Sequence, residues 1–281
     1  MKIGINSMST IRQMNEDFEE TIQRLKDCGC DMIEPMSDWG ASKKTLEFFE
    51  KLTGKSGWDP ENAKKRIQYI RSHGMDVKGM FVFDECLEEQ LPALGEFCRE
   101  NQISYVVLSF MDYTGIDDIY EKMDMIRRIA PTLKSYGVTV CLHNHDHDSH
   151  KVTDRDGKEK AILDMFIHHL SPEEMMLETD TGWLIYAGID PVKYVSEHQD
   201  RIAVLHFKDL CRDFGKKDRN DIFVACGQGV TDYKAILQAL SSENKKRMLY
   251  VIDQDNSQTD IVADLCAGIQ YFKGLETGYE S

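Results

Sequence analysis

Imidazole and carboxylate side chains close several short apolar runs of the sequence. Four of them are His143, Asp180, His206 and Asp253. Two imidazoles with two carboxylates make a mixed nitrogen and oxygen donor set, which suits Mn²⁺, Zn²⁺, Co²⁺ or Fe²⁺, whereas Mg²⁺ and Ca²⁺ prefer oxygen alone. If the runs are parallel strands of one barrel, their carboxyl ends meet on one rim. The sequence therefore predicts a divalent-metal site, for which we expect Mn²⁺ first, with Zn²⁺, Co²⁺, Fe²⁺ or Mg²⁺ as alternatives.

The same strand ends carry groups that could move a proton. Side chains alternate along a strand, so a residue two positions from a predicted ligand points the same way. His145 stands at that spacing and is our first choice for a general base, because a neutral imidazole is available near neutral pH. Glu178 and Asp253 are further candidate bases. Lys208 could polarise a substrate oxygen, or it could be a surface lysine paired with Asp209.

Four residues near these ends are expected to contact a substrate: Glu34, Asp148, Trp183 and Asp255. Trp183 could pack its ring against the apolar face of a sugar, or it could fill the core. Glu34 could bind substrate hydroxyls or hold a metal-bound histidine in place. The stretch 143–150 holds four histidines in eight residues, and its alternative interpretation is a metal-binding surface loop without a catalytic role.

The elements that must position these residues follow from hydrophobic patterning. Short apolar runs alternate with stretches of helical period, which favours parallel strands joined by crossover helices. The predicted strands are residues 2–6, 31–35, 77–83, 105–109, 138–143, 175–180, 202–206 and 248–253. The predicted helices are residues 16–28, 60–72, 87–99, 117–135, 158–170, 191–198, 232–240 and 260–272. Eight such pairs predict an α/β fold, a single (β/α)8 TIM-barrel domain over residues 1–281, with an open doubly wound sheet as the alternative. The polar connections 38–59, 145–157 and 208–230 follow predicted strands and would build the active face.

Composition excludes several classes of function. The chain has 34 basic and 49 acidic residues and a net charge of −15, which argues against a nucleic-acid partner. No apolar segment reaches the roughly 18 residues of a transmembrane helix, and the opening residues lack the order of a signal peptide. We therefore expect a soluble, cytoplasmic protein without a membrane partner. Its eight cysteines, which show no CxxC spacing, are expected to be reduced thiols. A homo-oligomer is compatible with the sequence, but no particular contact patch is predicted.

The strand-end motifs resemble those of the sugar phosphate isomerase/epimerase family, the xylose isomerase-like barrels that include inosose dehydratase, tagatose-type 3-epimerases and endonuclease IV. In chain order they are LHNHD at 142–146, ETDTGW at 178–183, AGIDP at 187–191, HFKD at 206–209, GQG at 227–229 with DY at 232–233, and VIDQD at 251–255. The resemblance covers nearly the whole chain and implies one divalent metal, held here by His143, Asp180, His206 and Asp253. The epimerases use a pair of glutamates where this chain has His143 and Asp253, so their two-glutamate proton transfer cannot be copied across.

The resemblance and the residues together predict a function. A divalent ion that binds the carbonyl of a keto sugar acidifies the neighbouring C–H bond. We expect a metal-dependent isomerase or epimerase of an unphosphorylated keto sugar or polyol derivative. The alternative is a lyase on the same scaffold, either an inosose-type dehydratase or an enzyme that eliminates the aglycone from a 3-keto glycoside, and His143 in place of glutamate favours it. A non-catalytic metal- or sugar-binding barrel is the alternative of another class. DNA repair is disfavoured, because the predicted strand 77–83 ends without a histidine.

Overall fold

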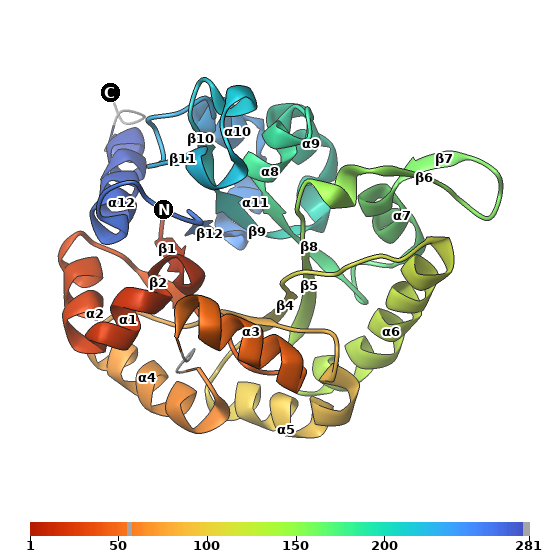
Figure 1. Ribbon diagram of the computed structural model, residues 1–281, viewed down its shortest axis with the longest axis horizontal. Coiled ribbons are helices and arrows are strands. Elements are labelled where there is room, and N and C mark those ends of the chain that lie inside the picture. The colour runs from red at the N-terminus through yellow and green to blue at the C-terminus, as the bar shows by residue number, and fades with distance from the viewer. Residues whose placement is uncertain (55–57, 278–281) are drawn as a thin grey trace.

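Eight parallel strands form the centre of the molecule, and helices surround them (Figure 1). The computed structural model describes residues 1–54 and 58–277. The strands are hydrogen-bonded in the order β2, β1, β12, β9, β8, β5, β4, β3, and isolated bridges from Met32 to Asp76 and from Met36 to Phe81 draw the two edges together. Their bounds are β1 Ile3–Asn6, β2 Met32–Glu34, β3 Gly79–Val82, β4 Tyr105–Leu108, β5 Thr139–His143, β8 Met176–Asp180, β9 Ile202–Phe207 and β12 Leu249–Ile252. The predicted barrel is confirmed, and the open sheet is excluded.

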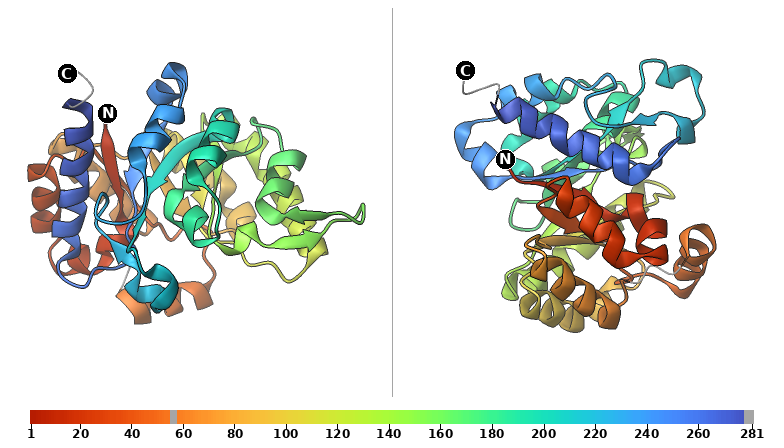
Figure 2. Two further views of the ribbon diagram at one scale, coloured as in Figure 1. Left: turned by 90° about the horizontal axis from the view of Figure 1, so that it is seen from above. Right: turned by 90° about the vertical axis from the view of Figure 1, so that its left-hand side faces the viewer.

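The longer helices lie outside the strands, as the patterning predicts (Figure 2). The described helices are α1 Ile11–Glu16, α2 Phe18–Asp27, α3 Lys43–Thr53, α4 Pro60–Ser72, α5 Leu87–Glu100, α6 Ile116–Ser135, α7 Ile162–His169, α8 Thr181–Tyr186, α9 Pro191–His198, α10 Tyr233–Ala239, α11 Ser242–Arg247 and α12 Ile261–Thr277. None of the described helices is long and apolar enough to cross a membrane.

One predicted helix boundary is wrong, and one predicted loop contains a helix. The helix expected at 158–170 begins at Ile162, because Glu159–Ala161 pairs with Lys151–Thr153 in an antiparallel hairpin, β6 and β7, that projects from the barrel (Figure 1). The connection 38–59, expected to be a loop, contains α3. Ser42 caps that helix by accepting a hydrogen bond from the Thr45 backbone N–H. The Phe49 ring of α3 packs against the ring of Phe83, which directly follows β3.

Period-two alternation turns the predicted site residues into the barrel. On β5, Leu142 belongs to the core between strands and helices, whereas Cys141 belongs to the core inside the barrel. His143 therefore points inward. On β9, Val204 lies inside, Leu205 and Phe207 lie outside, and the residue between these two outward side chains, His206, points inward in the same way.

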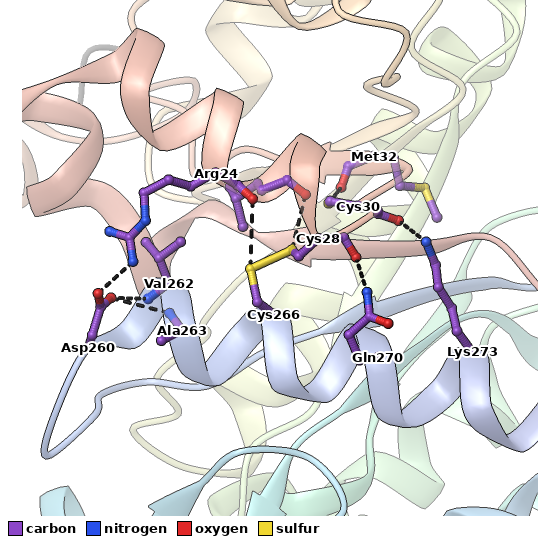
Figure 3. The surroundings of a disulfide bond; sticks show 12 residues. Arg24, Cys28, Cys30, Met32, Asp260, Val262, Ala263, Cys266, Gln270 and Lys273 are labelled. Atoms are coloured by element: carbon purple, nitrogen blue, oxygen red, sulfur yellow. Dashed lines mark hydrogen bonds and ion pairs between the residues drawn. A yellow bond between two sulfur atoms is a disulfide. The ribbon is translucent and has the colours of Figure 1, made fainter.

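The prediction that all cysteines are reduced is wrong for one pair. Cys28, at the end of α2, and Cys266, in α12, form a disulfide, and their Cα atoms are 5.4 Å apart (Figure 3). The two helices lie side by side, so the bond joins α2, near the start of the chain, to α12, the last described helix (Figures 1 and 2). Arg24 and Asp260 form an ion pair of 2.5 Å across the same seam. Sequence spacing could not reveal the pair, because 238 positions separate the cysteines. The other six cysteines lie within the described residues and are free.

Candidate metal and active site

The four predicted metal ligands meet at the carboxyl end of the barrel. His143 ends β5, Asp180 ends β8, His206 lies near the end of β9, and Asp253 directly follows β12. Each offers one ligand atom, these atoms lie within 4.8 Å of one another, and all four residues are buried. Asp180 Oδ2 and His206 Nδ1 form no hydrogen bond with any described residue, although Oδ2 lies 3.4 Å from Lys208 Nζ and Nδ1 lies 3.6 Å from Asp253 Oδ2. Buried polar atoms of this kind need a partner, and a divalent cation fits both the donor set and the spacing.

Glu34 and Glu178 hold the two imidazoles from the side away from this cluster. His206 Nε2 lies 2.7 Å from Glu34 Oε2 and 3.1 Å from Glu178 Oε1, while His206 Nδ1 faces Asp253 Oδ2 at 3.6 Å. His143 Nδ1 lies 2.9 Å from Glu178 Oε1, which leaves its Nε2 for a metal. Carboxylates in this position fix the orientation of a ligating imidazole and make it more basic.

Both glutamates are buried, which separates their charge states. Burial and the neighbouring Glu34 carboxylate raise the pKa of Glu178 well above its usual range. Burial alone would also raise the pKa of Glu34, but the His206 imidazole holds it below its ordinary value. The pKa values of the two carboxyl groups are therefore shifted in opposite directions, so Glu178 binds a proton more readily than Glu34 does. Of the two interpretations of Glu34, the structure places it on a histidine, and the buried Glu178 side chain contacts the His143 and His206 rings.

Opposing effects also set the protonation of two predicted ligands. Burial raises the pKa of Asp180 to about 6, against the attraction of Lys208. Burial acts to lower the pKa of His206, but the Glu34 and Asp253 carboxylates raise it to about 9.

Lys208 is buried, not a surface residue paired with Asp209. Its Nζ lies 2.5 Å from Asp255 Oδ1, 2.9 Å from Asp253 Oδ2 and 3.4 Å from Asp180 Oδ2. These contacts hold the pKa of Lys208 above its usual range although burial acts to lower it. Burial by itself would raise the pKa of Asp253, but the Lys208 ammonium lowers that pKa below its ordinary value. A carboxylate held this firmly ionised is a weak base, which suits a ligand better than a general base.

His145 lies beside the cluster of the four predicted metal ligands. Its ring centroid is 4.8 Å from that of His143 and 5.6 Å from that of Trp183. Burial, helped by Lys208 and His147, holds the pKa of His145 well below its usual value, so the ring is neutral at pH 7 and offers a lone pair. The Nδ1 atom is buried and forms no hydrogen bond with a described residue.

Two residues expected to contact substrate are engaged by the chain itself. Asp148 is buried, and it accepts hydrogen bonds from the Tyr113 hydroxyl at 2.8 Å and from the His145 backbone N–H at 2.7 Å. Trp183 is buried in a small apolar cluster, with the Lys208 ammonium 4.7 Å from its ring. The core interpretation of Trp183 fits this packing. Asp255, which pairs with Lys208, keeps 37% of its side chain exposed.

Three residues around the site were not predicted from the sequence. Phe81, on β3, packs against both predicted imidazole ligands, with ring centroids 5.2 Å from His143 and 5.7 Å from His206. Phe110 is 44% exposed and lies 5.2 Å from the His145 ring. The Arg219 guanidinium lies over the Trp183 ring and donates hydrogen bonds to both carboxylate oxygens of Asp146. Phe81 had a local signal in the alternation of its strand, whereas the Arg219 segment has no periodicity.

Comparisons with known proteins agree with this architecture. A family model described as xylose isomerase-like TIM barrel matches residues 22–266. An inosose dehydratase of Lacticaseibacillus casei is 28% identical over 136 residues, which cover 44% of this chain and 43% of that protein. The match thus spans less than half the length of the curated relative.

Solved structures share the fold over nearly the whole chain. A sugar phosphate isomerase/epimerase from Parabacteroides distasonis superposes with a TM-score of 0.72 at 17% identity, covering 96% of this chain and 92% of that one. The IOLI protein with a bound zinc atom superposes with a TM-score of 0.65 at 15% identity, covering 96% of each chain. At these identities the likeness shows the fold alone. Because the family model matches most of the sequence and the structure has the corresponding barrel, the chain belongs to the xylose isomerase-like TIM barrel family.

Proposed function

We propose that the protein is a divalent-metal-dependent enzyme that removes a proton next to the carbonyl group of a keto sugar or keto polyol. The observation that carries this proposal is the convergence of four nitrogen and oxygen ligand atoms within 4.8 Å, beside a neutral imidazole, at the carboxyl end of the barrel. When bound, the metal would polarise the carbonyl and stabilise the charge that develops as the proton leaves. The name inosose dehydratase, carried by a relative of part of the chain, supports this substrate class.

His145 is the proposed base. It is neutral at pH 7 and lies next to the ligand cluster, so its lone pair can accept the proton. The other two candidate bases suit the role less well, because the Lys208 ammonium lowers the pKa of Asp253 and because Glu178 is engaged with the His143 and His206 rings. Lys208, with its ammonium beside the same cluster, is the proposed group that stabilises a departing hydroxyl or alkoxide.

This arrangement supports elimination best. Epimerisation needs a group on each face of the reacting carbon, and the two glutamates that could serve as a second group contact the imidazoles instead. Elimination needs one base and a cation that stabilises the leaving oxygen, and His145 and the Lys208 ammonium provide these. We therefore propose a lyase, either an inosose-type dehydratase or an enzyme that releases the aglycone of a 3-keto glycoside. Isomerisation is the second candidate, because a single base can return the proton to the neighbouring carbon.

The test is to incubate the Mn²⁺-loaded protein with keto sugars, inososes and 3-keto glycosides in D₂O and to follow them by NMR. We expect loss of water or release of the aglycone, and we expect the rate of this reaction to fall about 10²- to 10⁴-fold in His145→Gln. His150→Gln is the matched control, since His150 is an exposed histidine of the same stretch. Deuterium-labelled sugar without an elimination product would instead establish an isomerase or epimerase. No turnover of any of these substrates with any of the candidate metals would refute the proposal and favour a binding barrel.

The finer expectations of the sequence belong to this proposal. We expect Mn²⁺, with Zn²⁺ as first alternative because the structure of a fold neighbour, the IOLI protein, contains a bound zinc atom. Element analysis of protein purified without added metal would decide between them. We also keep a cytoplasmic location and a sugar substrate without a nucleic-acid or membrane partner as proposals, and an assembly of identical copies as compatible with them.

A further inference from the structure

Lys208 is built into the barrel so that its ammonium reaches the metal-ligand cluster. The residue is 1% exposed, and its backbone carbonyl accepts a hydrogen bond from the Thr231 hydroxyl. Gly182 leaves room for its stem, because a Cβ at that position would lie 2.7 Å from Lys208 Cγ and 2.8 Å from Lys208 Cβ. The Trp183 and Phe223 rings lie 4.7 and 5.3 Å from the ammonium. The chain thus fixes a full positive charge at this point.

That charge contacts the same carboxylates that would bind the metal. Nζ lies 2.9 Å from Asp253 Oδ2, and this oxygen is also the one that faces His206 Nδ1 within the ligand cluster. Nζ lies 3.4 Å from Asp180 Oδ2, the atom that forms no hydrogen bond with a described residue. An ammonium and a dication this close repel each other, and they share the same negative charge.

Asp255 acts on Lys208 in the opposite sense. Its Oδ1 lies 2.5 Å from Nζ, whereas the two ligand carboxylates lie farther away. Asp255 is not a member of the four-residue ligand cluster. It therefore neutralises the ammonium without engaging the metal, and it draws the ammonium away from Asp180 and Asp253.

We propose that Lys208 and Asp255 set the affinity of the metal site: Lys208 competes with the divalent ion for Asp180 and Asp253, and Asp255 restrains that competition. This inference rests on the proposed metal site and deepens it. In this role Lys208 is a positioning residue for the metal. The useful consequence is a metal that is held less tightly by the protein and that keeps more positive charge for the carbonyl oxygen of the substrate.

The two residues predict opposite changes in affinity, which a merely structural role would not produce. Lys208→Met keeps the stem and removes the charge, so Mn²⁺ should bind more tightly by about tenfold or more. Asp255→Asn leaves the ammonium to the ligand carboxylates, so Mn²⁺ should bind about three- to tenfold more weakly. Lys151→Met and Asp156→Asn change exposed residues of the β6–β7 hairpin by the same chemistry and should leave the affinity unchanged.

The experiment measures the Mn²⁺ dissociation constant of the full chain and of each variant by competition with a fluorescent chelator, together with thermal melts with and without Mn²⁺. Without metal, the Tm of Lys208→Met should be lower than that of the wild type. Adding Mn²⁺ should raise the Tm of this variant more than it raises the Tm of the wild type. If that variant cannot be purified, Lys208→Gln in the same assay takes its place, beside Asp255→Asn. Tighter binding in the lysine variant with weaker binding in the aspartate variant supports the proposal. Equal or weaker binding in the lysine variant overturns it while leaving the metal site intact, whereas a wild type that binds no Mn²⁺ overturns the metal site as well.

Discussion

Metal binding to this site should release a proton from His206. Glu34 should control the number of protons released for each metal ion bound, because it raises the pKa of His206. A pKa of about 9 means that His206 is protonated at pH 7 in the metal-free protein. Because the ring must lose a proton to offer Nδ1 to a metal while Nε2 stays on Glu34, proton competition weakens apparent binding about 100-fold at pH 7. The apparent affinity should rise about tenfold for each pH unit between 7 and 9 and then level off.

The sign follows from the direction of the shift. A folded-state pKa above the ordinary value means that protonated His206 stabilises the metal-free protein fully below about pH 6.5, and that this contribution is lost as the pH rises through about 9. Metal binding has the opposite dependence on pH. Glu34→Gln keeps a hydrogen-bond acceptor near Nε2 but removes the charge that raises the pKa of His206, so the pH dependence should flatten. Loss of the negative partner also makes the imidazole a weaker ligand, by about 10- to 100-fold, and this offsets the gain at pH 7.

Calorimetric titration with Mn²⁺ at pH 7.5, in two buffers with different ionisation enthalpies, counts the released protons. We expect about one for the wild type and well below half for Glu34→Gln. Glu61→Gln, a change of an exposed glutamate in α4, should behave as the wild type. Equal proton release in the wild type and Glu34→Gln, or no release in either, would refute the electrostatic account of the His206 and Glu34 pair.

Three further predictions test the fold and the site. Cys28→Ser opens a link across 238 positions, and chain entropy alone gives a loss of about 5 kcal/mol, or roughly 10–20 °C in Tm, relative to Cys86→Ser; an unchanged melt in calorimetry would mean that the bond does not form. Gly182→Ala should cost about 1–3 kcal/mol in chemical denaturation because its Cβ would press on Lys208, whereas Gly215→Ala meets nothing within 4 Å and should cost less; equal losses would contradict the packing. Mn²⁺ at about 100 times its dissociation constant should raise Tm by roughly 5–10 °C, and a chelator should reverse the shift; a melt that ignores Mn²⁺ would exclude binding to the folded state.

The convergence of His143, Asp180, His206 and Asp253 was accessible from sequence because its signal is local. An apolar run with β-propensity ends at each of these residues, and alternation fixes the face on which His143 and His206 point. Parallel strands in a barrel then bring their carboxyl ends together, whatever the length of chain between them. Boundaries were less accessible where a second signal competes, as at Ile162, where the β6–β7 pairing delays the start of a helix.

What surrounds the cluster depended on tertiary structure. Sequence proximity suggested Asp209 as the partner of Lys208, but the ammonium contacts Asp253 and Asp255, which lie on another strand end. The link of α2 to α12 through Cys28 and the support of His206 by Glu34 are likewise contacts between distant parts of the chain. Alternation and helical period record which way a side chain points relative to its own element. Which partner it meets there is decided when the barrel closes and the first and last elements become neighbours.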